Sequence, residues 1–384
     1  MNKINLHLYP SDFKYESRIL KETKSLADAG LADRVFIAAV LKNGVKEYEK
    51  IDNKRDVWRA PLKTSSLPDD TFCKALKHLE WMVKILLKFK NEDIKFVNCH
   101  NLSSLPIGIL FKLFSKSKVI YDTHELETER NGWSKTRKTI AKLLEKSLIH
   151  KTDAVITVSD SIAQWYKNRY GLKKVHVVKN VPYRQNNKSQ HSDGLRQKFD
   201  IQDDEILYIY QGGLGGKKGI EILLDVFSKV DEKKHIVFMG YGSLENTIKK
   251  YETNFPNIHL QPAVKPQNIL KFTGSCDIGI HLPENTCLSY FYSLPNKIFE
   301  YIASGIPSVV SDFPEMAKIV DQTGCGWKVA PNAKSLIVLI EDISRKNIED
   351  KKINVLKCKD NFIWEKEEEK MLEVYKNIIN GSSD

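Results

Sequence analysis

The chain has 384 residues, of which 41% are hydrophobic and 28% are charged, and this composition excludes a disordered protein. The chain is longer than most chains that fold around a single hydrophobic core, so two domains are expected. No uncharged apolar run is long enough to span a membrane, and the first residues lack the apolar segment of a secretion signal. Six scattered cysteines without a C-x-x-C pair indicate neither a zinc site nor a disulfide framework, so we expect a cytoplasmic protein.

The charge is unevenly distributed along the chain, whose formal net charge is +11. Residues 1–190 hold 36 Lys and Arg against 21 Asp and Glu, whereas residues 191–384 hold 24 against 28. This asymmetry indicates that the first half faces something anionic, such as a lipid surface or phosphates. The alternative is that these lysines are solvated and have no partner.

Apolar, β-rich runs alternate with helical patterns through the first half of the chain. Helices are predicted at 17–30, 72–93 and 136–152, and strands are predicted at 4–9, 34–40, 94–100, 117–125, 153–159 and 174–180. The polar stretch at 180–194 is typical of a linker.

The same alternation starts again after this linker. The second half has predicted strands that begin near residues 206, 235, 257, 276 and 307, helices at 220–230 and 296–304, and an amphipathic helix at 361–381. Such alternation predicts an α/β fold with two Rossmann-like, doubly wound parallel-sheet domains that face a cleft. Ligands of such sheets bind at the carboxyl ends of the strands.

A glycine-rich segment, YQGGLGGKKGIE at Tyr210–Glu221, follows a predicted strand and opens a helix. Its glycines let backbone N–H groups approach a ligand, and a helix N-terminus favours anions. It is not a P-loop, because no Ser or Thr follows its lysines, and it is not G-x-G-x-x-G, because Lys218 is the sixth residue from Gly213. These mismatches count against a nucleotide kinase and a nicotinamide dehydrogenase, and the alternative is a tight turn without a ligand.

A second anion site is predicted where the helix of SLPNKIFEYIASGIPSVVSD begins at Pro295. Proline has no amide proton, so the free donors are the amides of Asn296, Lys297 and Ile298. Lys297 adds a positive charge, and Glu300, one turn further, can accept hydrogen bonds from two neighbouring hydroxyls, as on a ribose. A phosphate beside a diol describes a nucleotide, whereas the alternative is a plain Lys–Glu pair on an exposed face.

Four segments of the second half resemble the GT-B glycosyltransferases, most closely family 4, the retaining nucleotide-sugar enzymes of group 1 type. They are GGLGGKKGIEILLDVF, VFMGYGSLEN, NKIFEYIASGIPSVVSD and the terminal FIWEKEEEKMLEVY. In the first half, ESRILKETKSLADAG, VNCHN, VIYDTHE and DAVITVSD fall where family members carry comparable segments. The resemblance implies an acceptor-binding domain at 1–182, a nucleotide-sugar-binding domain at 183–360, and a helix at 361–384 that crosses back to the first domain.

The resemblance also implies roles for individual residues. Lys218 stands at the lysine that meets the donor diphosphate, and Glu300 stands at the glutamate that holds the ribose. The implied donor-binding residues are Gly212, Gly213, Leu214, Lys218, Tyr292, Asn296, Lys297, Ile298 and Glu300. Two positions depart from the family, because Gly213 replaces the usual arginine and Tyr292 replaces the first glutamate of E-x7-E. We hypothesise that Lys297 restores the lost charge from the opposite side of the diphosphate.

No Asp-x-Asp, the usual metal-binding pair of metal-dependent transferases, occurs in the chain. We therefore expect Lys218, Lys297 and backbone amides to stabilise the leaving diphosphate without a metal. The nucleoside-diphosphate sugar, UDP-linked on our prediction, is expected as co-substrate, with no further cofactor. Retention of the anomeric configuration is implied by the resemblance alone.

His124, in YDTHELETERNG, is the first-half residue most suited to catalysis, together with Lys218 and Glu300 in the second half. Because it follows a predicted strand, it should lie at the carboxyl edge of the sheet and face the cleft, where it can bond the donor sugar or the acceptor. His100 and Glu125 are candidates on the acceptor side, and Asp122 is a further one. The alternative is a structural histidine in a turn.

The predicted helix at 72–93 is amphipathic, with Lys77, Lys84 and Lys88 along one side and Leu79, Met82, Val83 and Leu86 along another. Such a helix can lie on anionic lipid, and it can equally pack on its own sheet. Both arrangements stay open from the sequence.

The prediction is thus a glycosyltransferase, peripheral to the inner face of the cell membrane. It would transfer a sugar to a saccharide or lipid-linked acceptor in surface polysaccharide biosynthesis. Alternatives are a sugar-nucleotide 2-epimerase of the same architecture and a non-catalytic relative that binds nucleotide sugar. Nucleic acid is not expected as a partner, because the basic half carries no recognisable reader motif and no stacking array of aromatic residues.

Overall fold

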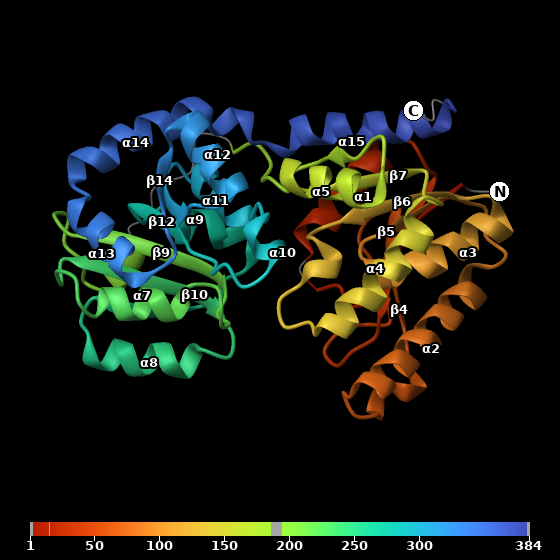
Figure 1. Cartoon of the computed structure of the whole chain (residues 1–384), viewed down its shortest axis with the longest axis horizontal. Coiled ribbons are helices and arrows are strands. Elements are labelled where there is room, and N and C mark those ends of the chain that lie inside the picture. The colour runs from red at the N-terminus through yellow and green to blue at the C-terminus, as the bar shows by residue number, and fades with distance from the viewer. Residues whose placement is uncertain (1–2, 15, 186–193, 382–384) are drawn as a thin grey trace. The chain divides into compact units, whose positions relative to one another are not determined.

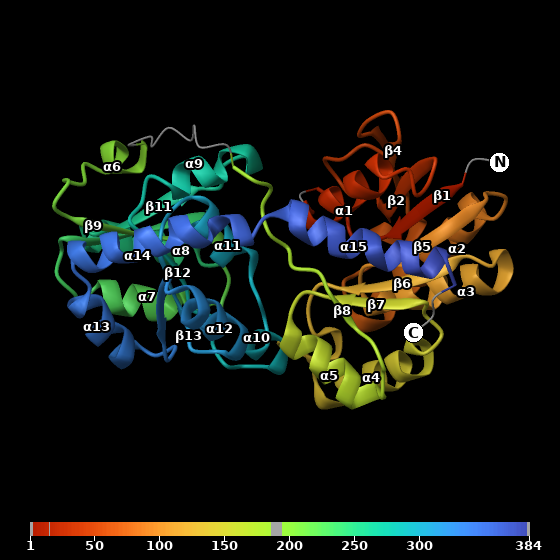
Figure 2. The ribbon, with the colours of Figure 1, turned by 90° about the horizontal axis from the view of Figure 1, so that it is seen from above.

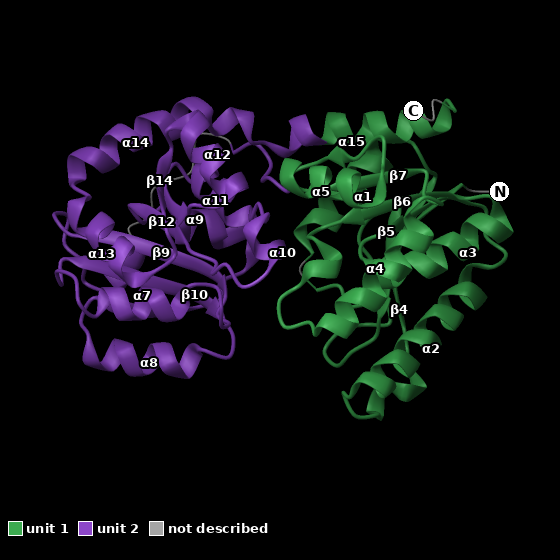
Figure 3. Cartoon of the chain, viewed as in Figure 1, with its two compact units in different colours: residues 1–179, 368–384 green, residues 180–367 purple. Residues whose placement is uncertain are grey.

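The structure is a computed structural model that describes residues 3–14, 16–185 and 194–381. It divides the chain into two compact units, unit 1 with residues 1–179 and 368–384 and unit 2 with residues 180–367 (Figure 3). The first boundary lies close to the predicted one at 182, and the second falls inside the last helix. The predicted linker begins at this first boundary, and its residues 186–193 lie outside the described residues.

Unit 1 contains an eight-stranded sheet in which β3 pairs antiparallel with β4 and the other neighbours pair in parallel. In sheet order the strands are β3 (Tyr48–Lys50), β4 (Arg55–Ala60), β2 (Arg34–Val40), β1 (Ile4–Leu8), β5 (Ile94–Cys99), β6 (Lys118–Thr123), β7 (Ala154–Thr157) and β8 (His176–Val177). The six predicted strands are confirmed, and β3 and β4 are additional.

Helices cover both faces of this sheet (Figures 1 and 2). α1 (Ser17–Asp28) and the C-terminal α15 (Trp364–Ile379) lie on one face, and α2 (Thr71–Phe89), α3 (Leu105–Ser115) and α4 (Lys135–Ile149) lie on the other. α5 (Asp160–Tyr170) follows β7, and short 3-10 turns occur at Lys63–Ser66, Leu102–Ser104 and Glu127–Glu129. The three helices predicted in this half are therefore confirmed.

The order of strands in unit 1 reverses between β1 and β5. The chain runs outward from β1 to β2 and β4, and then returns to β5 on the other side of β1. Loops that leave β1 and β5 therefore diverge, and the carboxyl ends of these strands meet at one point of the sheet edge. Residues His7, His100 and Asp122 lie at or next to the carboxyl ends of β1, β5 and β6.

One buried carboxyl group ties β6 to the helices beside it. Glu145 of α4 accepts hydrogen bonds from the hydroxyls of Tyr121 at 2.6 Å, Tyr166 at 3.0 Å and Tyr170 at 2.7 Å. Burial raises the pKa of Glu145 to about 7 despite these three donors. Since Tyr121 precedes Asp122, this cluster helps to place the sheet edge described above.

Unit 2 contains a six-stranded sheet with parallel pairing throughout. In sheet order the strands are β11 (Ile258–Pro262), β10 (Lys234–Tyr241), β9 (Ile206–Gly213), β12 (Ile278–His281), β13 (Ser308–Ser311) and β14 (Gly326–Val329). The helices are α6 (Gly194–Lys198), α7 (Ile220–Phe227), α8 (Glu245–Asn254), α9 (Ile269–Thr273), α10 (Leu288–Phe291), α11 (Asn296–Ala303), α12 (Pro314–Thr323), α13 (Ala333–Asp342) and α14 (Arg345–Cys358). Two 3-10 turns lie at Pro266–Asn268 and Lys359–Asn361.

The strand order of unit 2 reverses between β9 and β12, and α11 packs against this point. Gly279 of β12 makes the close approach possible, because a Cβ there would lie 2.3 Å from the ring of Tyr301 on α11. The Tyr301 hydroxyl donates hydrogen bonds to the carbonyls of Ile280 at 3.1 Å and Ile209 at 3.3 Å. The first turn of α11 is thereby held beside the carboxyl ends of β9 and β12.

The last part of α15 belongs to unit 1 (Figure 3). Tyr375 packs edge to face on Phe96 of β5, with ring centroids 5.1 Å apart, and its hydroxyl donates a hydrogen bond to Asn98. None of the described helices combines the length and the apolar character needed to cross a bilayer.

Glu145 should make a contribution to stability that falls as the pH rises toward 7, because folding favours its protonated form. This contribution is complete below the ordinary pKa of 4.5 and is lost as the pH rises through about 7. The free energy of unfolding should lose about 3 kcal/mol of this contribution. Urea unfolding of the unaltered protein and of Glu145→Gln across this pH range measures it, because the difference in stability between the two proteins should change by that amount. Parallel curves for the two proteins would contradict the prediction.

Candidate active site

The first group of candidate residues lies at the switch point of unit 2. β9 ends at Gly212 and Gly213, β12 ends at His281, and α11 begins at Asn296. The β9 loop leads to Lys218, just before α7. The structure therefore brings together both segments that the sequence singled out, the glycine-rich loop and the start of the helix after Pro295.

Lys218 and Lys297 both lie against the glycines of this loop. The Lys218 ammonium donates a hydrogen bond to the carbonyl of Gly213 at 3.5 Å. Gly212 has a φ of +120°, which favours glycine, and a Cβ there would lie 2.5 Å from Cε of Lys297 and would displace that side chain. Burial lowers the pKa of Lys297; the charge of Glu300 opposes this effect, and the neighbouring Lys218 adds to it by a smaller amount. Two like charges thus share one part of the site.

His281 is a third group in this place, and it was not predicted from the sequence. Its side chain is buried, and its Nδ1 has no hydrogen-bond partner among the described residues. Burial, and then Lys297 and Lys218, lower the pKa of His281 well below its ordinary value. A neutral imidazole beside two ammonium groups offers an additional N–H donor or acceptor without adding charge.

Glu300 is oriented by a buried chain of side chains. Its Oε2 accepts a hydrogen bond from Nε2 of Gln211 at 2.5 Å, and Oε1 of Gln211 accepts one from the hydroxyl of Thr273 at 2.5 Å. Among the described residues no ion pair joins Glu300 to Lys297, so the plain Lys–Glu pair considered above is not what the structure shows. The other carboxylate oxygen is left for a ligand.

The prediction that the amide of Ile298 is free is wrong. This N–H donates to the carbonyl of Pro295 at 3.3 Å, because the helix starts with a tight turn. Within the described residues, the amides of Asn296 and Lys297 have no acceptor. Leu214 lies in the core, and its amide donates to Tyr241, so it shapes the loop without offering a polar group. Tyr292 is half-buried at the end of α10.

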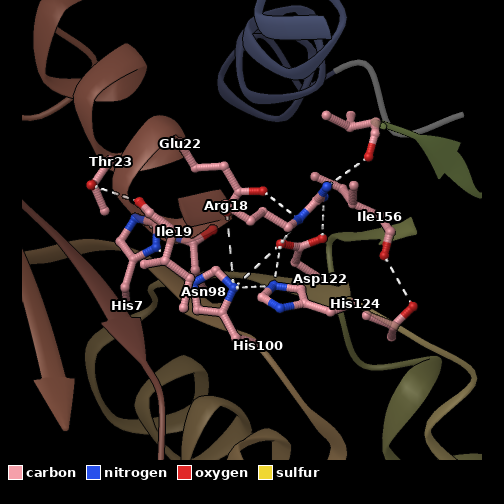
Figure 4. Close-up of polar contacts among 12 residues, drawn as sticks. His7, Arg18, Ile19, Glu22, Thr23, Asn98, His100, Asp122, His124 and Ile156 are labelled. Carbon is pink, nitrogen blue, oxygen red and sulfur yellow. Dashed lines mark hydrogen bonds and ion pairs between the residues drawn. The ribbon is translucent and has the colours of Figure 1, made fainter. Parts of the chain in front are cut away.

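The second group lies at the sheet edge of unit 1 and is centred on Arg18 of α1 (Figure 4). The guanidinium of Arg18 bonds Asp122 through Nε at 3.1 Å and Nη2 at 2.7 Å, and it bonds Glu22 at 2.8 Å. Burial opposes ionisation of Asp122, but Arg18 and His124 hold its pKa well below the usual range. Burial and the nearby Asp122 charge raise the pKa of Glu22 well above its ordinary value. One cation thus balances one of two buried carboxyl groups.

Three histidines continue this cluster in a row (Figure 4). Nδ1 of His7 lies 2.8 Å from Nε2 of His100, and Nδ1 of His100 lies 3.1 Å from Nε2 of His124. That nitrogen of His124 is also 3.2 Å from Oδ2 of Asp122. Burial lowers the pKa of His100 to about 4, and burial followed by His100 lowers the pKa of His7. Both inner rings are therefore neutral at pH 7.

Of the first-half candidates, His124 is the partly exposed member of this cluster, with 22% of its side chain accessible. His100 is buried beneath it and contacts protein groups on both ring nitrogens, so it supports His124. Glu125 is half-buried and pairs with Arg130 at 3.1 Å. The structure therefore groups His124, His100 and Asp122 and turns Glu125 toward another partner.

Two overlapping sets of side chains offer metal-ligating atoms within 4.8 Å of one another, His7 with Glu22 and His100, and His100 with Asp122 and His124. Arg18 already bonds the carboxylates of both sets. A cation there would lie beside a guanidinium, so we assign no metal ligands to these residues.

Sequence reasoning missed Arg18, Asn98, His7, Gln211 and His281. Their residue types are polar, but each stands within or beside an apolar run and so looked like part of a strand or helix. His7 and His281 lie in the last part of predicted strands, and this position was the available signal, since such ends line ligand sites in parallel sheets.

Two family models match nearly the whole chain between them. Residues 19–181 match the model described as glycosyltransferase family 4, and residues 192–356 match the one described as glycosyl transferases group 1.

Individual proteins are similar at low identity over most of the length. Chitobiosyldiphosphodolichol beta-mannosyltransferase of Kluyveromyces lactis is 22% identical over 369 residues, which cover 86% of this chain and 81% of that protein. Sucrose-phosphate synthase from Thermosynechococcus elongatus superposes with a TM-score of 0.78 at 15% identity and covers 99% of this chain and 100% of that one. Anabaena HepE in complex with UDP has a TM-score of 0.69 at 14% identity and covers 99% of each chain.

The solved structures share the fold, with two Rossmann-like parallel-sheet domains, and the region that matches the group 1 model contains both Lys218 and Glu300. The chain belongs to the glycosyltransferases of the GT-B fold, with a family 4 domain in its first half and a group 1 domain in its second.

Proposed function

We propose that this enzyme transfers a sugar from a nucleoside-diphosphate sugar, UDP-linked, to a saccharide or lipid-linked acceptor in surface polysaccharide biosynthesis. The main support for a nucleoside-diphosphate sugar as donor is that Lys218 and Lys297 both lie at one glycine-rich turn. Glu300 follows one helical turn after Lys297. The UDP complex of Anabaena HepE supports the choice of nucleotide. The name of the Kluyveromyces relative, which specifies a diphosphodolichol-linked chitobiose, supports a lipid-linked acceptor.

The donor diphosphate would lie between the two lysines. As the bond between the sugar and the β-phosphate oxygen breaks, its electron pair passes to that oxygen, and the growing charge is stabilised by both ammonium groups and by the amides of Asn296 and Lys297. His281 can add an uncharged donor. Because two protein cations serve this role, metal-independent transfer is part of the proposal, and Glu300 is assigned to the ribose hydroxyls.

Retention of configuration is also part of the proposal. An inverting reaction needs a free carboxylate or histidine base opposite the leaving group. The carboxyl groups of Asp122 and Glu22 are buried and bound to Arg18, and Glu300 is bound to Gln211, so none of these carboxylates is such a base. His124 is the histidine that an inverting reaction would use, and the retention that we propose assigns it to binding alone. The leaving phosphate would instead accept the proton of the acceptor hydroxyl. His124 is assigned to a contact with the donor sugar or the acceptor.

Peripheral membrane contact at the inner face of the cell membrane completes the proposal. α2 buries Trp81, Ile85 and Phe89 against unit 1, so it does pack on its own sheet. Met82 and Leu86 are half-buried, whereas four other large apolar side chains of α2 are exposed, and neighbouring α3 and α4 expose more. They are Phe72 (71% exposed), Leu79, Val83, Leu87 (60%), Leu113, Phe114 (79%), Ile140, Leu143 (63%) and Leu144. Lysines flank them on each helix, which suits a surface of anionic lipid.

Replacing either lysine with methionine should weaken UDP binding by about 10- to 100-fold, because each loses a charge-assisted contact with phosphate and keeps its apolar stem. Glu300→Gln should instead weaken UDP and uridine equally, since the ribose contact is common to both. Isothermal titration calorimetry with the two ligands measures these effects.

Lys217→Met is the matched control for this experiment. Lys217 precedes Lys218 in the same loop, but its side chain is exposed and pairs with Glu284 at 3.4 Å. Its loss should leave UDP affinity unchanged. If the Lys218 and Lys297 variants bind UDP as the Lys217 variant does, the donor site lies elsewhere.

Product analysis distinguishes the alternatives. We expect the donor sugar to appear on an added acceptor, with UDP as co-product, in the anomeric configuration that it had in the donor, as NMR of the product shows. A 2-epimerase would change the donor sugar without any acceptor, and a non-catalytic relative would bind UDP and form no product. A product of inverted configuration would refute retention alone.

The membrane contact predicts co-sedimentation with vesicles that contain anionic phosphatidylglycerol, weakened by salt because lysines contribute. The double variant Leu87→Ser, Phe114→Ser should bind such vesicles at least about tenfold more weakly, since each apolar side chain contributes about 1 kcal/mol or more when buried in lipid. Leu356→Ser, which alters an exposed leucine of unit 2, should bind as the unaltered protein does. Equal binding by all three proteins would refute this surface.

A further inference from the structure

Gln211 is an amide buried on the apolar face of β9 that meets α11. On this face Leu207 and Ile209 lie in a hydrophobic cluster together with Tyr301 of α11. Gln211 follows them at the same two-residue spacing, and only 3% of it is exposed. An apolar side chain would fill this place at a lower desolvation cost, so packing alone does not account for the amide.

Each end of this amide has a partner on another element. Nε2 of Gln211 donates to Oε2 of Glu300 on α11, and Oε1 accepts from the hydroxyl of Thr273 on α9, both at 2.5 Å. Thr273 is fully buried. The hydroxyl of Ser304 just after α11 donates to the carbonyl of Leu270 in α9 at 3.2 Å, which keeps the two helices together. The amide therefore connects β9, α9 and α11.

The carboxylate determines the direction of these two bonds. An ionised carboxylate can only accept hydrogen bonds, so the NH2 group of Gln211 faces Glu300 and its carbonyl faces Thr273. The Thr273 hydroxyl has a second possible acceptor in the carbonyl of Ile269, 2.8 Å away. Its single proton is needed by Gln211, because among the described residues no other group donates to Oε1 and a buried acceptor without a donor is costly.

Gln211 thus holds Glu300 in one position and leaves its second carboxylate oxygen open. Burial lowers the pKa of Lys297 and the charge of Glu300 opposes this effect, so the two side chains are close enough to interact. Without the amide, the carboxylate would be free to turn toward Lys297, as in ordinary pairs three residues apart on a helix. It would then no longer be held in the direction of a ligand.

We propose that Gln211 is a positioning residue that directs Glu300 at the ribose and thereby sets a preference of the donor site for a ribonucleotide over a 2′-deoxyribonucleotide. This inference rests on the proposed function, in which Glu300 bonds the ribose hydroxyls. A carboxylate that is fixed beforehand can accept from the 2′- and 3′-hydroxyls together. A mobile carboxylate must first be ordered, and it gains little from the second hydroxyl.

Titration calorimetry with UDP and 2′-deoxy-UDP tests this preference. Effects common to both ligands, such as a change at the diphosphate, cancel in the ratio of the two affinities. We expect the unaltered protein to bind UDP about 10- to 100-fold more tightly, because the deoxy ligand lacks one hydrogen bond to a charged group. In Gln211→Met, which keeps the length of the side chain and removes the amide, the ratio should fall to about threefold or less.

Gln211→Glu provides a readout that a purely structural role would not change. It places a second carboxyl group beside Glu300, and two carboxyl groups in such contact share one proton. With this proton the new side chain donates to Glu300 as the amide does, and without it the two groups repel each other. The preference for UDP should therefore be lost near about pH 8 and regained toward about pH 5, whereas the ratio of the unaltered protein should change little.

Gln261→Met is the matched control, because it makes the same substitution on β11, two strands away from β9 in the same sheet. Nε2 of Gln261 donates to the carbonyl of Pro262 at 3.0 Å, and its Oε1 accepts from Lys198 at 2.7 Å. This variant therefore also loses two hydrogen bonds of an amide. Its affinity ratio should equal that of the unaltered protein.

The inference is overturned if UDP and 2′-deoxy-UDP bind the unaltered protein equally, or if both Gln211 variants keep its ratio at every pH. In either case UDP binding would leave the proposed donor standing. If the unaltered protein binds neither ligand, the proposed function and this inference are refuted together.

Discussion

Repulsion between Lys218 and Lys297 is the constraint on which the donor side of this protein depends. Both ammonium groups lie against Gly212 and Gly213, and among the described residues no ion pair joins Lys297 to Glu300. Burial is the main reason that the pKa values of Lys297 and His281 are lowered, and the neighbouring lysine charges add to it. A ligand with two phosphates would neutralise both ammonium groups and so relieve the repulsion. The site is therefore suited to a diphosphate. Gly212 matters because any side chain there would displace Lys297.

The charged cluster of unit 1 has the opposite composition, because carboxyl groups outnumber cations in it. Two buried carboxyl groups, Asp122 and Glu22, share the cation of Arg18, and a row of three imidazoles supplies the remaining hydrogen-bond partners. Both clusters occupy switch points, β1 with β5 in one unit and β9 with β12 in the other. Parallel sheets leave diverging loops at these points, and the groups that carry chemistry collect there. His124 is the one member of the histidine row that reaches the surface.

Much of the fold could be predicted because its strands and helices appear in the sequence as periodic patterns of apolar residues. The strands of both sheets that are rich in Val, Ile and Leu were found, and so was the helix that follows Pro295. β4 was missed, since three of its six residues are charged. In the structure Arg55 bonds Asp52, Arg59 bonds Glu49, and Asp56 pairs with Arg34, so a buried strand is compatible with those charges only through partners from elsewhere. Likewise, the pattern of α2 predicted its amphipathic character, but packing decided that Trp81, Ile85 and Phe89 form the buried face.

The sequence by itself determined the fold class, the glycine-rich turn before Lys218 and the helix start that carries Lys297 and Glu300. These are local features, because a turn or a helix start depends on residues within a few positions of each other. Only the tertiary structure decided that Glu300 is held by Gln211 and that His7, His100 and His124 form one row at the ends of three strands. Residues more than twenty positions apart meet through strand order and register, and a single sequence contains no record of those contacts.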